Sequence, residues 1–385
     1  MNIGFDVAQT CESRAGCAWY ADSLVKALVN LKTKDQFILY HHFGNLVNGN
    51  TKHGTGLQDS RVKMPLKELG TKEAEELWQE DESLKARLGN PEIIHANCFR
   101  APRVAGVKLV YTVYDLSFWA KPDYTTEANR LTCQSGTLEA LKNADGFIFI
   151  SKNARDEFER FLPGYLKDSK KPWVVTALAP RSMFKEMIEE GVDNGDKQGN
   201  VSAGKPYWLS VGTLEPRKNY EGVLDALELY WAKSSIKVPL VIAGGGGWNS
   251  SMLKSRIKAL EAKGMVKYLG YVEDEALPGL YRNAKALLFP SFYEGFGLPI
   301  VEALSMGCPV ITSNHPCLLE LKSFGVSYID PRDANGLAIE MLKAEPKKTH
   351  GLRRRIIKAV CLRKYSWEKT AKKTLAFYKE VLGLA

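Results

Sequence analysis

Residues 289–303, FPSFYEGFGLPIVEA, place acidic side chains and glycines just after a short apolar run, ALLF, that predicts a strand. Glycine can adopt positive φ and lets backbone amides approach a ligand closely. A helix expected from Leu298 presents free N–H groups that suit an anion. The two carboxylates would repel phosphate, but they suit hydroxyl groups, which donate charge-assisted hydrogen bonds to them. The segment therefore predicts a nucleotide-sugar site formed by Glu294, Gly295, Phe296, Gly297, Leu298 and Glu302. The alternative is a glycine-rich turn with two solvated glutamates.

A second segment, residues 210–219 (SVGTLEPRKN), has the same construction of a strand followed by a glycine-bearing loop. Gly212 lies at the end of the strand, and the loop ends in the adjacent cations Arg217 and Lys218. A guanidinium binds a diphosphate bidentately and an ammonium acts as a point charge. Both are therefore candidates to neutralise the charge of a departing nucleotide diphosphate. The alternative is a solvent-exposed basic turn.

Two weaker signals lie in the first half of the chain. Gly16 follows the first expected strand and could let the backbone approach a diphosphate, although a plain turn would use a glycine equally well. Asp115 follows a buried strand at the polar end of YTVYD, where it could receive a proton or bind a sugar hydroxyl. Helix capping or loop support is the other account of Asp115.

The other glycines, histidines and cysteines predict no metal or redox chemistry. Residues 244–247 (GGGG) predict a tight turn with possible phosphate proximity, because the acid expected later in a dinucleotide fold is missing. His41, His42 and His95 are expected to be structural, since no third ligand falls at a convincing spacing. The seven cysteines are scattered without a CxxC pair, which is typical of reduced thiols. No metal and no other cofactor is therefore expected.

These motifs fall at strand ends within two series of alternating strands and helices. Such alternation predicts parallel sheets in an α/β protein, with two doubly wound halves and a cleft between the carboxyl ends of their strands. The first series has strands at 2–7, 36–40, 92–95, 109–113, 147–150 and 173–176, and helices at 17–31, 72–88, 126–142 and 152–162. The second has strands at 207–211, 240–243, 266–269, 286–289, 309–312 and 327–329, and helices at 220–233, 250–262, 275–283, 298–306 and 333–344. The polar stretch between the two series, residues 189–206, has the composition of a linker.

Composition and charge limit the classes of protein. The chain has 385 residues, 45% of them hydrophobic, which is ample for the cores of two globular domains. No apolar run approaches the ~18 residues of a membrane span, and no leader precedes the first strand, so a cytoplasmic protein is expected. The net charge of +9 is concentrated from residue 341 onward, with Arg353, Arg354 and Arg355 at its densest point. Such a segment lies on an anionic membrane surface, faces an acidic partner or forms solvated helix faces. Nucleic-acid binding is not expected, because no recognised module accompanies the charge.

With these motifs, the chain resembles the retaining glycosyltransferases of family 4, which have the GT-B fold of two facing Rossmann-like domains. The resemblance rests on two glutamates separated by seven residues around a Gly-Phe-Gly loop, Glu294-GFGLPIV-Glu302. It also rests on the element ending in Arg-Lys-Asn and on the stretch LGYV at 269–272 ahead of Leu280 and Tyr281. The domains it implies are residues 1–185, joined by a C-terminal helix at 366–385, a linker at 186–205, and residues 206–365. The first would bind the acceptor and the last the donor.

The resemblance also implies residue roles. Glu294 and the amides of residues 295–298 would hold the donor sugar and phosphate, while Glu302 would bind the ribose hydroxyls. Arg217 and Lys218 would grip the diphosphate, with Gly16 approaching it from the first domain. The base would meet the backbone around Tyr271 and Val272. Two departures stand out: Tyr114 precedes Asp115 where the family often has histidine, and the amino-terminal loop carries fewer glycines than usual.

The function predicted is metal-independent transfer of a hexosyl unit, with retention, from UDP-glucose, another UDP-hexose or GDP-mannose to an acceptor hydroxyl. The acceptor would be a glycan or lipid-linked glycan in cell-surface polysaccharide or glycolipid synthesis, at the inner face of the cell membrane. Two other interpretations stay open at this point. One is a nucleotide-sugar epimerase on the same fold, which would turn over the donor without an acceptor. The other is a non-catalytic nucleotide-sugar-binding subunit.

Overall fold

The computed structural model describes residues 1–10, 16–41, 55–66, 73, 76–77, 83–97, 103–181, 184, 205–248, 250–344 and 350–384. These residues belong to two compact units, each with its own sheet. Unit 1 comprises Met1–Ala120, Glu127–Leu178 and Ser366–Ala385, and unit 2 comprises Lys121–Thr126 and Ala179–Tyr365. Except for Lys205, the linker predicted at 186–205 lies outside the described residues.

Unit 1 is built on a parallel seven-stranded sheet with the strand order β3-β2-β1-β4-β5-β6-β7. Its inner strands are almost continuous runs of buried side chains, as expected where helices cover both faces of a parallel sheet. The order reverses between β1 and β4, and doubly wound sheets bind ligands at such a reversal. The strands are β1 (Asn2–Asp6), β2 (Gln36–Tyr40), β3 (Val62–Lys63), β4 (Ile93–Ala96), β5 (Lys108–Val113), β6 (Gly146–Phe149) and β7 (Trp173–Val175).

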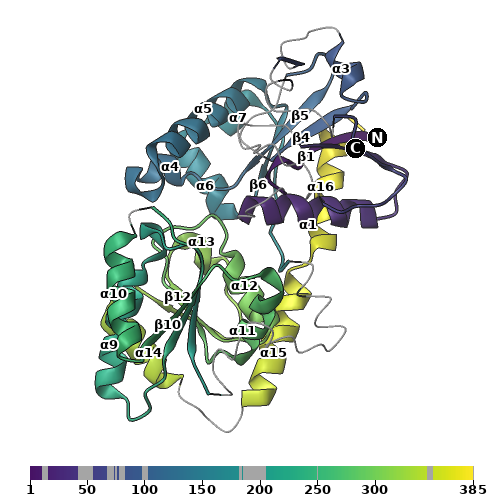
Figure 1. The fold of residues 1–385 in the computed structure, drawn as a ribbon. Coiled ribbons are helices and arrows are strands. Elements are labelled where there is room, and N and C mark those ends of the chain that lie inside the picture. Colours follow the sequence, from purple (N-terminus) through teal and green to yellow (C-terminus); the bar gives the residue numbers. More distant parts are fainter. Residues whose placement is uncertain are drawn as a thin grey trace. The chain divides into compact units, whose positions relative to one another are not determined.

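The helices of unit 1 cover its sheet from two sides, and α1 lies beside the C-terminal helix α16 (Figure 1). The buried residues of α16 recur at spacings of three and four, which gives this helix one apolar face toward the unit. The helices are η1 (Ala8–Thr10), α1 (Gly16–Asn30), α3 (Leu84–Arg87), α4 (Ser117–Ala120), α5 (Glu127–Asn143), α6 (Lys152–Phe161), α7 (Tyr165–Ser169) and α16 (Trp367–Val381).

Unit 2 is built on a parallel six-stranded sheet with the strand order β10-β9-β8-β11-β12-β13. Here the order reverses between β8 and β11. The strands are β8 (Trp208–Val211), β9 (Leu240–Ala243), β10 (Val266–Gly270), β11 (Leu287–Phe289), β12 (Val310–Ser313) and β13 (Val326–Ile329).

Helices also cover both faces of the unit 2 sheet, with α9, α10 and α14 on one side and α11, α12 and α15 on the other (Figure 1). They are η3 (Pro122–Tyr124), η4 (Pro216–Lys218), α9 (Tyr220–Lys233), α10 (Ser251–Ala262), η5 (Asp274–Ala276), α11 (Leu277–Asn283), α12 (Leu298–Ser305), α13 (Pro316–Leu319), α14 (Ala334–Lys343) and α15 (His350–Lys364).

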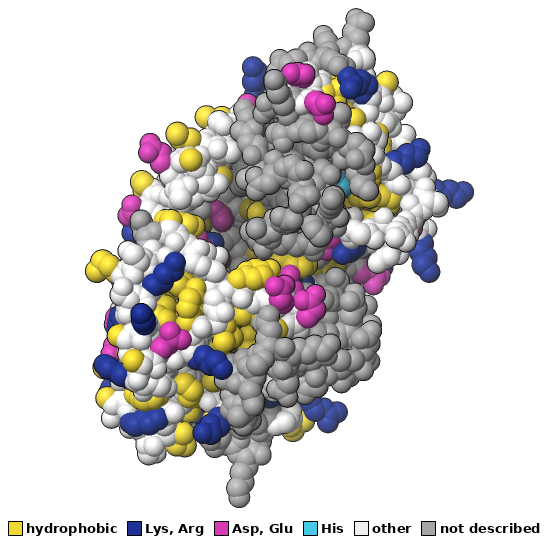
Figure 2. Space-filling view, in the orientation of Figure 1, with side chains coloured by type: hydrophobic (Ala, Val, Ile, Leu, Met, Phe, Trp, Pro, Cys, Tyr) yellow, Lys and Arg dark blue, Asp and Glu magenta, His cyan; other side chains and the backbone are white. Residues whose placement is uncertain are grey.

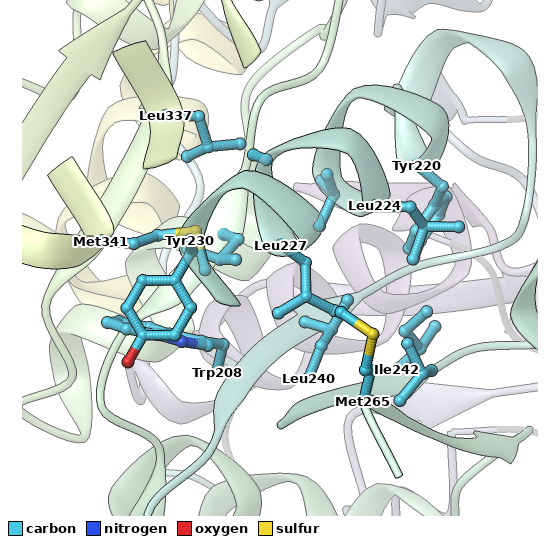
Figure 3. Packing of buried hydrophobic residues seen from close by; sticks show 14 of the residues in the cluster. Trp208, Tyr220, Leu224, Leu227, Tyr230, Leu240, Ile242, Met265, Leu337 and Met341 are labelled. Carbon is cyan, nitrogen blue, oxygen red and sulfur yellow. The ribbon is translucent and has the colours of Figure 1, made fainter. Parts of the chain in front are cut away.

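The core of unit 2 fills the space between its sheet and α9, α10 and α14 (Figure 3). Trp208 on β8 and Tyr230 on α9 are both fully buried, and their rings meet edge to face at 5.5 Å. Leu227 on α9, Leu240 on β9 and Met341 on α14 belong to the same cluster. This packing fixes β8 in place, and so it fixes the loop that follows β8.

The expected strands are all present, and each end lies within one residue of its prediction. The helix predicted at 72–88 is described only in part, with α3 near its end, and the remainder includes residues outside the described set. The short elements β3, α4, α7 and α13 have no counterpart among the predictions, because two to five residues contain too few repeats to show a period. Within the described part of the chain, no helix combines the length and apolarity that a membrane crossing requires.

Candidate functional site

The two strongest sequence motifs meet where the strand order of unit 2 reverses. β8 and β11 are adjacent there; the arginine–lysine loop follows β8 and the glycine–glutamate loop follows β11. The backbone N–H of Phe292 donates to the carbonyl of Arg217 at 2.8 Å, so the two loops are directly connected. The structure therefore brings both motifs to the place where a doubly wound sheet binds its ligand.

Asn219 fixes the shape of the arginine–lysine loop. Its φ of 58° lies in the left-handed region, which asparagine tolerates better than most residues. Its side-chain oxygen accepts the N–H of Gly222 in the first turn of α9, at 3.3 Å. Its amide nitrogen donates to the carbonyls of Pro290 (3.1 Å) and Pro331 (2.6 Å). One side chain thus caps α9 and joins the loops that follow β8, β11 and β13.

Four charged side chains form an ion-pair cluster at this junction. Lys218 Nζ lies 2.6 Å from Oε1 of Glu294, and Arg217 Nη1 lies 3.2 Å from Oε2 of the same carboxylate. Arg217 Nη2 lies 2.8 Å from Oε1 of Glu215. Two cations and two carboxylates give the cluster no net charge, although its carboxylates and Lys218 are largely buried.

Burial and neighbouring charge act on this cluster in opposite directions. Burial alone would raise the pKa of Glu294, but the charges of Lys218 and Arg217 outweigh it, and the pKa is lowered from its usual value. Burial lowers the pKa of Lys218 and the charge of Arg217 adds to that effect, while the carboxylates of Glu294 and Glu215 oppose it. Glu294 is therefore ionised at neutral pH and accepts hydrogen bonds only.

The start of α12 supplies backbone donors beside Glu294. Gly297 precedes the helix with a φ of 92°, and a Cβ there would lie 2.8 Å from the side chain of Leu318. Gly297 therefore uses the positive φ that glycine allows, whereas Gly295 does not adopt one. The first amides of a helix lack partners within the helix and carry partial positive charge. This end of α12 can therefore receive an anion.

The glycines after β8 and β9 are needed for close approach of one loop to the other. Gly212 has a φ of 140° and Gly244 a φ of 159°, and a Cβ on Gly244 would lie only 1.9 Å from the carbonyl oxygen of Gly212. Gly212 donates its N–H to Ala243 at 2.9 Å, and Gly244 donates to Gly270 at 2.7 Å. The tight turn predicted at 244–247 is wrong: Gly246 forms an isolated parallel bridge with Leu214, and the N–H of Leu214 donates to Gly245 at 2.9 Å, so the glycines run alongside the loop that carries the cations.

Tyr271 and Val272, the predicted base-binding segment, follow β10 directly. Gly270 ends that strand with a φ of 67°. The side chain of Tyr271 is 60% exposed, whereas Val272 is buried at 6%. The chain thus leaves the strand with an exposed aromatic ring next to an anchored residue.

Glu302, one turn inside α12, is held by a residue that the sequence did not indicate. Arg181 donates from Nε to Oε1 at 2.5 Å and from Nη2 to Oε2 at 3.0 Å. Its Nη1 donates to Oδ1 of Asp274 at 2.5 Å, and the hydroxyl of Tyr281 donates to Oε2 of Glu302 at 3.3 Å. Burial would lower the pKa of Arg181, but the charge of Glu302 raises it. Burial first, and then Glu302, raise the pKa of Tyr281 well above its usual value.

The two predicted site residues of unit 1 are described within that unit. Gly16 is the exposed first residue of α1, and a Cβ there would meet no atom within 4 Å. Residues 11–15, which precede it, lie outside the described set. Asp115 follows β5, and its Oδ1 accepts the N–H of Ser117 at the start of α4, at 2.9 Å. That contact fits the helix-capping or loop-support account left open by the sequence; a role of Asp115 toward a sugar stays a prediction.

Comparison with known proteins decides the family. Residues 192–360 match the family described as glycosyl transferases group 1. The O-antigen chain mannosyltransferase B of Escherichia coli is 32% identical over 281 residues, which cover 71% of this chain and 70% of that protein. The chain belongs to the group 1 glycosyltransferases.

Solved structures agree on the fold of this glycosyltransferase. Sucrose-phosphate synthase from Thermosynechococcus elongatus superposes with a TM-score of 0.67 at 18% identity, covering 100% of both chains. Anabaena HepE, solved in complex with UDP and glucose, has a TM-score of 0.64 at 16% identity, covering 99% of this chain and 100% of that one. At such identities the likeness concerns the fold alone. With the two parallel sheets described above, it confirms the predicted GT-B fold class.

The remaining features of the glycosyltransferase do not involve residues of the ion-pair cluster. Among the described residues, no group of three or more histidines, cysteines or acids is placed to hold a metal. The described cysteines, at 17, 133, 308, 317 and 361, are not in disulfides. A hollow of about 440 Å³ lies in unit 1 beside the amino ends of β4 and β5, where Lys108 pairs with Asp145 at 2.9 Å. None of the predicted site residues lines that hollow.

Three site residues of the transferase carried too weak a signal in the sequence. Arg181 lies 121 positions before Glu302, so no spacing rule connects the two. Asp274 lies among three consecutive acids at 273–275, a pattern equally typical of a solvated turn. Asn219 belongs to the Arg-Lys-Asn element, and only its left-handed backbone and its contacts explain why asparagine stands there.

Proposed function

We propose that this glycosyltransferase moves a hexosyl unit from a nucleotide diphosphate sugar to an acceptor hydroxyl, with retention at the anomeric carbon. The observation that carries the proposal is the ion-pair cluster in which Arg217 and Lys218 hold Glu294. Cations at the carboxyl end of a strand suit a diphosphate, and a carboxylate among them suits sugar hydroxyls. Both halves of a nucleotide sugar thus find matching groups within one loop junction.

The proposed chemistry begins with departure of the nucleotide diphosphate. As the bond from the anomeric carbon to the phosphate oxygen breaks, negative charge grows on the diphosphate. Arg217, Lys218 and the amides at the start of α12 would stabilise that charge. The acceptor oxygen then bonds to the anomeric carbon on the face that the diphosphate leaves, and its proton passes to a phosphate oxygen. Because this chain's own cations oppose the charge, we propose that the transfer needs no divalent metal.

The remaining donor contacts follow the resemblance. Glu294 would accept hydrogen bonds from the sugar hydroxyls, and Glu302 from the ribose. The backbone at Tyr271 and Val272 would meet the base. In unit 1, we propose that Gly16 approaches the diphosphate and that Asp115 contacts the sugar or the acceptor. Gly212 would contribute through the loop that it allows to pack.

The transferred sugar that we favour is mannose. The E. coli relative that is 32% identical to this chain is named an O-antigen chain mannosyltransferase, and a Salmonella typhimurium protein of the same type is 35% identical over 127 residues. We therefore propose GDP-mannose as the first donor to test and UDP-hexoses as the second. A growing glycan on a lipid carrier, as in cell-surface polysaccharide synthesis, is the acceptor that we propose.

We further propose that the protein works at the inner face of the cell membrane, held there by α15. That helix carries six basic residues and no acid. Leu352 and Ile356 are 67% and 41% exposed on it, and nearby Phe324 is 50% exposed beneath the guanidinium of Arg353. Exposed apolar side chains among arginines suit an anionic lipid surface, because the apolar side chains can insert between the lipids and the arginines can bind the anionic head groups.

The opposite face of unit 2 has a different surface. Over α9 and α10, basic, acidic and hydrophobic side chains are interspersed (Figure 2). There, Arg256 is surrounded by the carboxylates of Glu221, Asp225 and Glu228, at 2.6 to 2.8 Å. The positive and negative charges of this surface neutralise one another, so it should attract an anionic membrane much less than α15 does.

The experiment that tests the function begins with a thermal-shift panel of GDP-mannose, UDP-glucose and other nucleotide sugars, because a ligand of the folded state raises its apparent stability. The stabilising donor is then incubated with a membrane lipid extract, with and without a chelator. We expect transfer only when the acceptor is present, and a product whose anomeric configuration, read by NMR, matches the donor. Donor turnover without acceptor would instead indicate an epimerase, and binding without turnover a non-catalytic subunit.

A further inference from the structure

Arg181 binds the two carboxylate oxygens that a ribose would need. Its Nε and Nη2 donate side by side to Oε1 and Oε2 of Glu302, at 2.5 and 3.0 Å. This is the bidentate arrangement in which a guanidinium recognises a carboxylate. The two neighbouring hydroxyls of a ribose also present two donors side by side, one for each oxygen. The guanidinium and the ribose diol would therefore bind the same pair of oxygens.

Because the Arg181–Glu302 pair is buried, the guanidinium and a ribose diol cannot bind the carboxylate of Glu302 at the same time. The side chain of Glu302 is 2% exposed and that of Arg181 is 6% exposed, so the guanidinium covers the carboxylate. Among the described residues, the other hydrogen bond to this carboxylate comes from Tyr281 at 3.3 Å, which is long for a hydroxyl donor. Tyr281 is itself fully buried on α11. A hydroxyl that approaches Glu302 from solvent thus has to displace Arg181.

Asp274 gives Arg181 a second partner. Nη1 of Arg181 already lies 2.5 Å from Oδ1 of Asp274, whose side chain is 20% exposed. A buried charge left without a partner is strongly unfavourable. A guanidinium that leaves Glu302 avoids this outcome, because it keeps the bond to Asp274 and turns toward water. The three charged groups thus provide two acceptable positions for one side chain.

We propose that Arg181 is an affinity-determining residue of the donor site: it holds Glu302 until the ribose diol of the bound nucleotide takes its place, and it then pairs with Asp274. This inference rests on the proposed nucleotide site and adds to it a competitor that belongs to the chain itself. Every nucleotide that uses Glu302 must first break the Arg181–Glu302 pair. Arg181 therefore weakens nucleotide binding and favours release of the product nucleotide.

The test is calorimetric titration of the full chain with GDP and UDP and with the 2′-deoxy form of each. The variant Arg181→Met removes the guanidinium and keeps the length of the side chain. We expect it to bind the preferred nucleotide about 10- to 100-fold more tightly than the wild type, the range for hydrogen bonds to a charged group. We also expect a larger ratio of ribo- to deoxynucleotide affinity, because an uncovered carboxylate gains more from the second hydroxyl.

Two further variants make the test decisive. Arg181→Lys keeps the charge but lacks the planar fork, so its affinity should fall between wild type and Arg181→Met; it decides the matter if Arg181→Met does not fold. Arg256→Met removes another guanidinium that is paired with carboxylates, on α9 and α10, and should leave affinity unchanged.

Equal or weaker binding by the folded Arg181 variants, or a ribo-to-deoxy ratio that falls toward one, would overturn the proposal. That result would mean that Arg181 orients Glu302 for the ribose instead of competing with it. If the wild-type protein bound neither nucleotide, the proposed donor site would be wrong, and the role proposed for Arg181 would be wrong with it.

Discussion

The carboxyl ends of the two sheets hold different kinds of polar group at the points where the strand orders reverse. In unit 2, between β8 and β11, ionised side chains face one another, with Lys218 and Arg217 on Glu294. In unit 1, between β1 and β4, the polar groups bind backbone. The carboxylate of Asp6 accepts the N–H groups of Ala8 and Asn97 at 2.9 and 3.0 Å.

The polar groups of unit 1 continue inward as a neutral network. Fully buried His95 lies between the hydroxyl of Tyr378 on α16, at 2.6 Å, and that of Thr112 on β5, at 2.5 Å. Burial lowers the pKa of His95 to about 3, so the imidazole is uncharged at neutral pH. The expectation that His95 is a structural histidine is confirmed by these two contacts, which join the C-terminal helix to the sheet.

The difference shows how one topology serves two purposes. Hydrogen bonds to backbone, as at Asp6, cannot be exchanged for a ligand without opening the fold. Ion pairs between side-chain tips, as at Glu294, can be exchanged, because a phosphate replaces a carboxylate as the partner of a cation. The comparison therefore predicts that changes in the charged junction of unit 2 alter binding and catalysis, whereas changes in the neutral network of unit 1 alter stability.

The largest effect is expected from Glu294→Gln. The amide cannot accept sugar hydroxyls as strongly as the carboxylate, so the rate of transfer should fall about 10²- to 10³-fold or more. The loss of one negative charge gives the cluster a net positive charge, so free nucleotide diphosphate should bind at least as tightly as before. Transfer assays and calorimetry on the same preparation measure the two effects. Full activity would remove Glu294 from the site.

A smaller effect is expected from Arg217→Met. Loss of one charge-assisted contact to the diphosphate should weaken nucleotide diphosphate binding by about 1.5–3 kcal/mol, or roughly 10- to 100-fold. Arg217→Lys keeps the charge but not the bidentate geometry, so it should recover only part of the loss. Calorimetric titration measures both. Unchanged affinity in the methionine variant would contradict the assignment of Arg217 to the diphosphate.

The sequence predicted much of the charged junction because its signals are local. Gly212, Arg217 and Lys218 lie within one loop. Glu294 and Glu302 lie within one strand–helix connection. Each motif can therefore be recognised in a window of fifteen residues. The strands, which are continuous apolar runs between glycine- and proline-rich turns, are legible for the same reason. In these segments the local sequence pattern was enough to predict the structure that forms.

The unpredicted parts depend on contacts between distant positions. Arg181 reaches Glu302 across 121 residues, and Tyr378 reaches His95 across 283. No periodicity or composition predicts such pairs, because the two residues come together only when the chain folds. The backbone of Gly295, which lacks the positive φ of Gly297, was also open in the sequence, because a glycine permits positive φ but does not require it. The pairing of Glu294 with the very cations assigned to the diphosphate was likewise visible only in three dimensions.

Acid should affect the two regions in different ranges of pH. His95 titrates at about 3 in the folded state but near 6.5 when unfolded, so the unfolded chain binds more protons between these values. The free energy of unfolding should therefore decrease by about 1.4 kcal/mol per unit as the pH falls below 6.5. The pKa of Glu294 is lowered below 4.5, so its contribution is lost only in stronger acid.

The variant His95→Gln isolates the first of these ranges. It removes the titrating group, so urea unfolding measured between pH 7 and pH 5 should show a shallower dependence on pH than in the wild type. Glu294→Gln should leave the dependence in this interval unchanged. If both variants keep the wild-type slope, the neutral network of unit 1 does not contain the acid-sensitive group.

The smallest effect is expected from changes in α15. Here the comparison is between two faces of unit 2: the one that carries α15 and the one that carries α9 and α10. Leu352→Ser with Ile356→Ser should weaken binding to phosphatidylglycerol vesicles about 3- to 10-fold, through loss of inserted apolar surface. Met252→Ser, at an 83% exposed site on α10, is the matched control and should have no effect. Vesicle flotation measures both, and equal binding by all variants would favour a solvated helix face.

Arg354 must stay unchanged in that experiment, although it belongs to the densest basic run. Its guanidinium donates to the carbonyls of Arg282, at 2.8 Å, and Ala284, which end α11, so it holds α15 in place. Removing all three arginines at 353–355 would therefore loosen the helix as well as discharge it, and a loss of vesicle binding could not be attributed to charge. Arg353→Gln with Arg355→Gln removes the exposed charges alone, and its effect should disappear at high salt while that of the serine variant persists.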